Sequence, residues 1–200
     1  MQGVDATVLT LLLNEHADSP PDPITNKPVE KTRERVNFLV AELQKQKQKI
    51  IIPTPVLAEV LVVSGASGLR YIDVLQKASV FEIRDFDRLA AIELALMTRQ
   101  ALDAGKGKKK SGSSEPWQKI KLDRQIVSIC KVSGVTTLYA SDNSLSNFAK
   151  QAGMKVIGVH ELPLPPTPPQ LSMHELLEAK SIESEAPSPT DKDDDEDEEA

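Results

Sequence analysis

The sequence has little cysteine and no long uninterrupted apolar run. Its single cysteine among 200 residues, Cys130, excludes an internal disulfide framework, and within the helical pattern IVSICKV we interpret it as a small core residue. The apolar stretch IIIPTPVLAEVLVV is interrupted by two prolines and a glutamate, and falls short of the roughly 18 residues that a membrane span needs. We recognise no signal peptide. We therefore expect a cytoplasmic location and no membrane contact.

Aromatic residues are absent after Phe148, and the acidic charge of the chain is concentrated in its C-terminal part. Residues 175–200 carry a net charge of −10, against −6 for the whole chain, which leaves +4 for residues 1–174. This segment follows the proline cluster PLPPTPP and ends in DDDEDEEA, a composition that cannot bury enough apolar surface to fold. We predict one globular domain over residues 1–162, and a proline-rich linker with a disordered acidic tail over 163–200.

Three interpretations of the acidic tail are open. It is an inert solubilising segment, a binding arm for a basic partner, or an internal mimic of nucleic acid that covers the lysine-rich loop at 104–116. The third interpretation is a hypothesis of autoinhibition. It fails if deletion of residues 175–200 leaves the activity of the domain and its affinity for nucleic acid unchanged at low salt.

Short β-rich runs alternate with helical patterns along residues 1–162. This alternation predicts an α/β fold with a central parallel sheet covered by helices on both faces. In such sheets ligands bind beyond the carboxyl ends of the strands. The expected strands are 2–4, 50–53, 80–83, 137–140 and 155–159.

Four acidic residues stand where such a site would form. Asp5 ends the first strand, Asp142 follows the fourth, Glu59 lies in the helix after the second, and Asp123 lies early in the helix that enters the fourth. Converging carboxylates repel one another unless a cation lies among them. Oxygen ligands favour Mg²⁺ or Mn²⁺, which can polarise a phosphodiester and generate a hydroxide nucleophile.

Each acid also has a structural interpretation. Asp5 and Asp142 are suited to cap the helices that follow them, and Glu59 and Asp123 to be solvated acids near helix starts. The sequence has no Walker loop and no nucleophile elbow, so a metal site is the one catalytic chemistry that it suggests.

Lysines just before Asp123 are candidates for RNA phosphate contacts that do not read the base sequence. A Lys/Gly/Ser loop is equally often a soluble, flexible connection. Trp117 at the end of this loop could stack a base, but we favour an anchor on the core. The candidate lysines are Lys106, Lys108, Lys109, Lys110, Lys119 and Lys121.

Five motifs in order resemble the PIN domain family, the ribonuclease fold of VapC-type toxins. They are VDATVL, IPTPVLAEVL, FDRLAAIELA, KIKLDRQIVSIC and TLYASDNSLSNFAKQAGMKVIGV, which together cover about residues 1–160. The resemblance implies a three-layer α/β/α fold with strand order 3-2-1-4-5. It also implies hydrolysis of RNA to 5′-phosphate and 3′-hydroxyl ends with Mg²⁺ or Mn²⁺.

The resemblance carries over to individual residues. It implies Asp5, Asp123 and Asp142 as metal ligands, and Glu59 as a fourth catalytic acid. It further implies supporting roles beside the metal ligands for Thr7 and Asn143, although many members carry another acid at the position of Asn143.

The same resemblance implies partners. They are an RNA substrate, an antitoxin protein and a second copy of the chain in a homodimer. The function expected is a metal-dependent endoribonuclease, as a toxin or as an RNA-processing enzyme. The alternative is a PIN-like RNA- or protein-binding module with an incomplete, non-catalytic acidic pocket.

Overall fold

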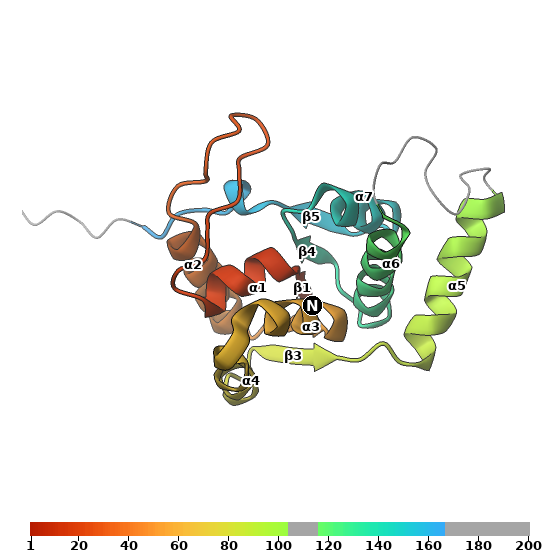
Figure 1. Cartoon of the computed structure of the whole chain (residues 1–200), viewed down its shortest axis with the longest axis horizontal. Coiled ribbons are helices and arrows are strands. Elements are labelled where there is room, and N and C mark those ends of the chain that lie inside the picture. Colours follow the sequence, from red (N-terminus) through yellow and green to blue (C-terminus); the bar gives the residue numbers. More distant parts are fainter. Residues whose placement is uncertain (104–115, 167–200) are drawn as a thin grey trace, which may run out of the picture. The chain divides into compact units, whose positions relative to one another are not determined.

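The computed structural model describes residues 1–103 and 116–166 (Figure 1). One compact unit extends from Met1 to Pro165. The predicted acidic tail, four of the candidate lysines and the side chain of Trp117 lie outside the described residues.

Five parallel strands form one sheet in the order β3-β2-β1-β4-β5. This confirms the order 3-2-1-4-5 that the family resemblance implied. The first strand has the expected three residues, and the third begins one residue later than expected. The strands are β1 (Gln2–Val4), β2 (Ile50–Pro53), β3 (Phe81–Arg84), β4 (Thr137–Tyr139) and β5 (Lys155–Ile157).

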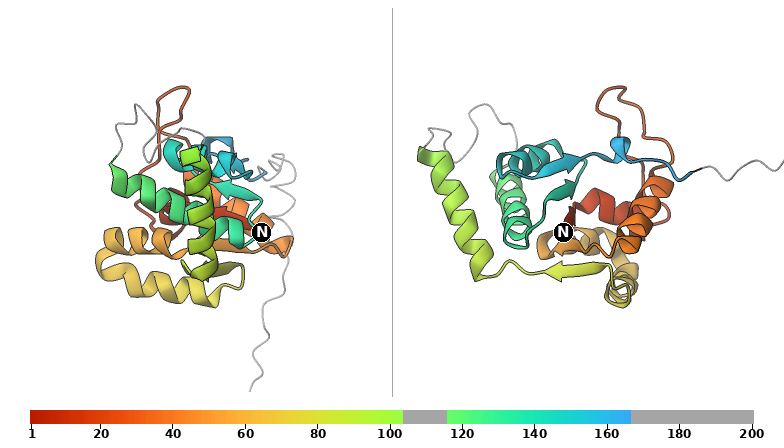
Figure 2. Two further views of the ribbon diagram at one scale, coloured as in Figure 1. Left: turned by 90° about the vertical axis from the view of Figure 1, so that its right-hand side faces the viewer. Right: turned by 180° about the vertical axis from the view of Figure 1, so that it is seen from behind.

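Helices connect the strands and pack on both faces of the sheet, which confirms the three-layer α/β/α architecture (Figures 1 and 2). Two single-turn 3₁₀ helices, η1 (Gly65–Ser67) and η2 (Val159–Glu161), accompany them. The α-helices are α1 (Ala6–Leu13), α2 (Thr32–Lys45), α3 (Thr54–Ser64), α4 (Gly68–Lys77), α5 (Arg88–Asp103), α6 (Trp117–Val132) and α7 (Asn143–Gln151).

The core is centred on β2, whose three isoleucines Ile50–Ile52 are fully buried. A strand that is buried on both faces reads as a continuous apolar run, which explains the sequence III. Helix α2 turns Val36, Leu39 and Leu43 toward this core, since their spacing places them on one face of the helix.

Gly3 in β1 lies where the core is crowded. A Cβ atom placed there would meet Leu138 Cδ1 at 3.1 Å, and both Cys130 Sγ and Val135 Cγ1 at 3.2 Å. The absence of a side chain therefore allows β1 to lie close to α6 and β4. The buried Cys130 confirms its interpretation as a core residue.

Helices α3 and α4 follow one another through η1, so that the segment SGASG forms the turn between them. Helix α3 begins at Thr54 with Pro53 in the cap position and a second proline, Pro55, in its first turn. Among the residues that the structure describes, the run Thr54–Lys77 is long and apolar enough to cross a membrane, by length and composition alone. It is bent at η1, however, and Val56 and Val60 pack into the core.

Helix α5 packs along α6 at the side of the sheet, as both views of Figure 2 show. Asp87 lies just before this helix, and its carboxylate accepts the Ala90 N–H at 2.9 Å. Ala90 is the buried residue of the helix. The larger apolar side chains Leu89, Ile92 and Leu96 are instead more than half exposed. This stripe is therefore not part of the core.

Candidate active site

Strands β1 and β4 lie side by side and deliver two aspartates to the same edge of the sheet. Val4 pairs with Tyr139 at the ends of these strands, and the Asp5 N–H donates to the Tyr139 carbonyl at 3.0 Å. Asp5 comes next on one strand, and Asp142 follows three residues after Tyr139 on the other. The parallel register thus brings together carboxylates that are far apart in the sequence.

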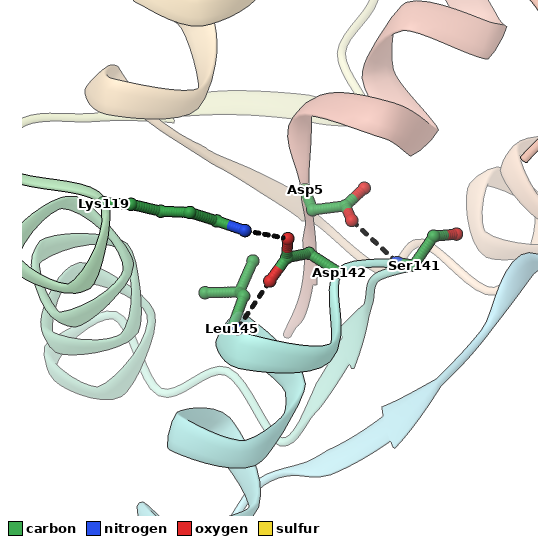
Figure 3. A network of polar contacts seen from close by, with 5 residues as sticks. All are labelled: Asp5, Lys119, Ser141, Asp142 and Leu145. Atoms are coloured by element: carbon green, nitrogen blue, oxygen red, sulfur yellow. Dashed lines mark hydrogen bonds and ion pairs between the residues drawn. The ribbon is translucent and has the colours of Figure 1, made fainter. Parts of the chain in front are cut away.

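Asp5 is buried and held by backbone donors (Figure 3). Its side chain caps α1 by accepting the Val8 N–H at 2.8 Å through Oδ1, and Oδ2 accepts the Ser141 N–H at 2.7 Å. Burial raises the pKa of Asp5 to about 6. These N–H groups lower that pKa, and the neighbouring charge of Asp142 raises it further.

Asp142 lies beside Asp5 and is less buried. Its Oδ1 accepts the Leu145 N–H at 2.9 Å and so caps α7, while Oδ2 accepts a hydrogen bond from Lys119 Nζ at 2.7 Å (Figure 3). Partial burial raises the pKa of Asp142, but the hydrogen bond and charge of Lys119 together with the helix N–H groups outweigh it. The net pKa lies below the ordinary value, so Asp142 is ionised at neutral pH.

Helix α6 brings two charged residues to this edge. Lys119 and Asp123 are four residues apart and therefore lie on one face of the helix. Asp123 is buried, with 5% of its surface exposed. The guanidinium carbon of Arg124 lies 5.3 Å from the Phe148 ring centroid of α7, a cation–π contact that holds α6 against α7.

The structure brings together two of the four predicted acids. Asp5 and Asp142 are neighbours, Asp123 is buried on α6, and Glu59 is exposed on α3. Within residues 1–103 and 116–166, no three His, Cys, Asp or Glu side chains are grouped closely enough to hold a metal ion. The helix-cap interpretation of Asp5 and Asp142 is also confirmed, since both carboxylates cap helices.

The chemistry at this pair suits a hard cation. Its donors are carboxylate oxygens, and a cation, the Lys119 ammonium, already lies 2.7 Å from Asp142. In the chemical type of its donors, the pair thus fits Mg²⁺ or Mn²⁺. The Lys119 ammonium is the counter-ion of the Asp142 carboxylate.

The remaining candidates lie around this pair. Thr7 is half-buried in the first turn of α1, Asn143 is exposed at the start of α7, and Lys121 is exposed on α6. Lys119, which we had predicted as an RNA contact, is the ion-pair partner of Asp142. Its four-residue spacing from Asp123 could have indicated that Lys119 faces the acids.

The fold resembles solved structures of toxin–antitoxin proteins. A chain of the VapBC2 complex from Rickettsia felis, bound to a DNA fragment from its promoter, matches 78% of this chain and 97% of its own length, with 15% identity and a TM-score of 0.51. A DNA-bound VapBC complex from Salmonella typhimurium (15% identity, 79% and 97% coverage) and VapC20 from Mycobacterium tuberculosis, a toxin that cleaves the sarcin–ricin loop (14% identity, 82% and 100% coverage), each have a TM-score of 0.46.

Sequence comparison adds nothing to this structural likeness. No protein-family model matches the chain, and no curated protein matches it. The likeness to the Rickettsia felis structure concerns the fold, and it confirms the fold that the five motifs indicated: that of a VapC-type PIN domain.

Proposed function

We propose that the protein is a metal-dependent endoribonuclease that hydrolyses RNA phosphodiester bonds. The observation that supports this most is the pairing of Asp5 with Asp142 at the carboxyl ends of adjacent parallel strands. This is the edge at which α/β sheets bind ligands. Buried and half-buried carboxylates there provide the negative charge that a divalent cation requires.

In this proposal Asp5, Asp123 and Asp142 hold Mg²⁺ or Mn²⁺, and Glu59 on α3 completes the set of catalytic acids. The bound metal supplies an activated water and polarises the phosphodiester. The Val8 and Ser141 N–H groups fix the orientation of the Asp5 carboxylate, so that little reorganisation is needed when a cation binds. Thr7 and Asn143 support the ligands from beside them.

The fold also suggests the setting in which the enzyme works. We propose a toxin of a toxin–antitoxin pair, because the similar Rickettsia felis structure is a VapBC2 complex. The partners proposed are RNA, an antitoxin and a second copy of the chain, in the cytoplasm and without membrane contact. Residues 1–162 form the nuclease domain in this proposal, and 163–200 the linker and acidic tail, with the candidate lysines contacting RNA phosphates.

The test is cleavage of a labelled structured RNA with Mn²⁺ by wild type, Asp5→Asn and Asp123→Asn. We expect both variants to fall to background while their circular dichroism spectra stay native. Asp87→Asn is the matched control, because Asp87 also caps a helix, at α5, and asparagine caps as well as aspartate. The proposal is wrong if the wild type does not cut, or if the two variants cut as well as the control.

Two observations favour a second function. No group of three metal-binding side chains is found in the described part of the chain, and Lys119 neutralises Asp142. These features suit a PIN-like module that binds RNA or protein without cleaving it. Such a module would bind labelled RNA equally well with Mn²⁺ and with EDTA, and its expression without an antitoxin would not arrest growth.

A further inference from the structure

Lys119 places a positive charge beside Asp142, one member of the acidic pair. Its Nζ lies 2.7 Å from Asp142 Oδ2, and its side chain reaches from α6 toward the pair in Figure 3. The other oxygen of Asp142, Oδ1, is engaged by the Leu145 N–H at the start of α7. The ammonium therefore occupies the side of the carboxylate that is not needed for capping.

A divalent cation at the same carboxylate would meet this ammonium. Mg²⁺ binds a carboxylate oxygen at about 2.0–2.1 Å. Two cations on one oxygen would lie within a few ångströms and repel each other strongly in a partly buried site. Only one of the two cations can therefore contact Asp142 Oδ2.

The ion pair is easily broken. The Lys119 side chain is 42% exposed and that of Asp142 33%, so water can solvate both partners when they separate. Ion pairs that water can reach in this way contribute little to stability. The lysine has a flexible four-carbon chain that can move its charge into solvent.

We infer that Lys119 is a displaceable internal cation that competes with the divalent metal for Asp142. The inference rests on the proposed metal-dependent function and adds a regulatory element to that site. Lys119 balances the charge of Asp142 before the metal binds, and lowers the affinity for the metal. A metal that binds releases the partly exposed ammonium into solvent.

The experiment is calorimetric titration of Mn²⁺ into the full-length chain at low ionic strength, with no RNA present. We expect Lys119→Met to bind Mn²⁺ about fivefold more tightly than the wild type, since a competing ion pair and a neighbouring positive charge are removed. Asp142→Asn, which keeps a helix cap, should abolish or strongly weaken binding in either background.

Lys131→Met is the matched control. Lys131 lies 12 residues further along α6, about 18 Å away along the helix axis. It pairs with Glu93 Oε1 at 2.6 Å, and its side chain is 43% exposed, close to the value for Lys119. Its removal should leave the Mn²⁺ affinity unchanged.

The outcomes separate the two proposals. Unchanged or weaker Mn²⁺ binding by Lys119→Met, with binding still lost in Asp142→Asn, overturns the competition while the metal site stands. An equal gain in Lys131→Met also overturns it, because the effect would then be one of net charge. If neither the wild type nor Lys119→Met binds Mn²⁺, the proposed metal-dependent function fails and the competition fails with it.

Discussion

Asp5 Oδ2 accepts the backbone N–H of Ser141 at 2.7 Å, although 136 residues separate them in the sequence. This hydrogen bond ties the end of β1 to the loop that leads from β4 to α7. It also keeps Asp142, the next residue, beside Asp5. The position of Asp142 beside Asp5 therefore depends on the pairing of β1 with β4.

The raised pKa of Asp5 makes stability depend on pH. Its value of about 6, against 3.8 for the unperturbed group, means that the folded state binds a proton more tightly than the unfolded state. The contribution of Asp5 is therefore fully present below pH 3.8 and is lost as pH rises through 6, a change of about 3 kcal/mol. Asp5→Asn should lack this dependence.

Urea denaturation of wild type and Asp5→Asn from pH 4 to pH 7 measures the effect. Other groups titrate in both proteins, so the informative quantity is the difference between their free energies of unfolding. We expect the free energy of unfolding of Asp5→Asn to increase relative to that of wild type as pH rises. A difference that stays constant would show that Asp5 is ionised with an ordinary pKa.

Gly3 should be sensitive to any added side chain. Gly3→Val would press on Leu138, Cys130 and Val135, and we expect it to lower the free energy of unfolding by about 1–3 kcal/mol. Because Asp5 is two residues further along the strand, Mn²⁺ affinity should fall as well. Leu75→Ala, in the buried position of α4, should destabilise the protein without changing Mn²⁺ affinity. Equal Mn²⁺ affinities in the two variants would contradict the link between packing at Gly3 and the metal site.

Asp142 has a capping role that can be separated from its charge. Asp142→Asn keeps an acceptor for the Leu145 N–H and loses only the half-exposed ion pair with Lys119, so its stability should lie within about 1 kcal/mol of wild type. Asp142→Ala loses the cap too, and should be about 1 kcal/mol less stable than Asp142→Asn. Thermal denaturation compares them, and equal melting temperatures for the two variants would rule out the cap as a source of stability.

The exposed stripe on α5 is suited to contact a second copy of the chain. Ile92 and Leu96 are 52% and 55% exposed and lie one turn apart. We expect Ile92→Glu with Leu96→Glu to change the free energy of unfolding by less than about 0.5 kcal/mol per substitution, and to convert a dimer into a monomer in sedimentation. A monomeric wild type, or a dimer that survives both substitutions, would exclude α5 as the dimer contact.

Local patterns predicted the five strands. Runs such as III depend on neighbouring residues alone, and each strand lies within two residues of its expected bounds. The fifth strand ends two residues earlier than expected, because the buried Val159 belongs to η2 and not to the sheet. The strand order came from the family resemblance, since local spacing does not encode long-range pairing.

The sequence by itself determined the alternation of strands and helices, the aspartates that cap α1 and α7, and the concentration of acidic charge after residue 174. These follow from propensity, capping and composition, which act over a few residues. Only the tertiary structure decided that Asp5 meets Asp142, that Lys119 pairs with it, and that the apolar stripe of α5 stays exposed. Those relations depend on how helices pack on a sheet whose neighbouring strands β1 and β4 lie more than 130 residues apart in the chain.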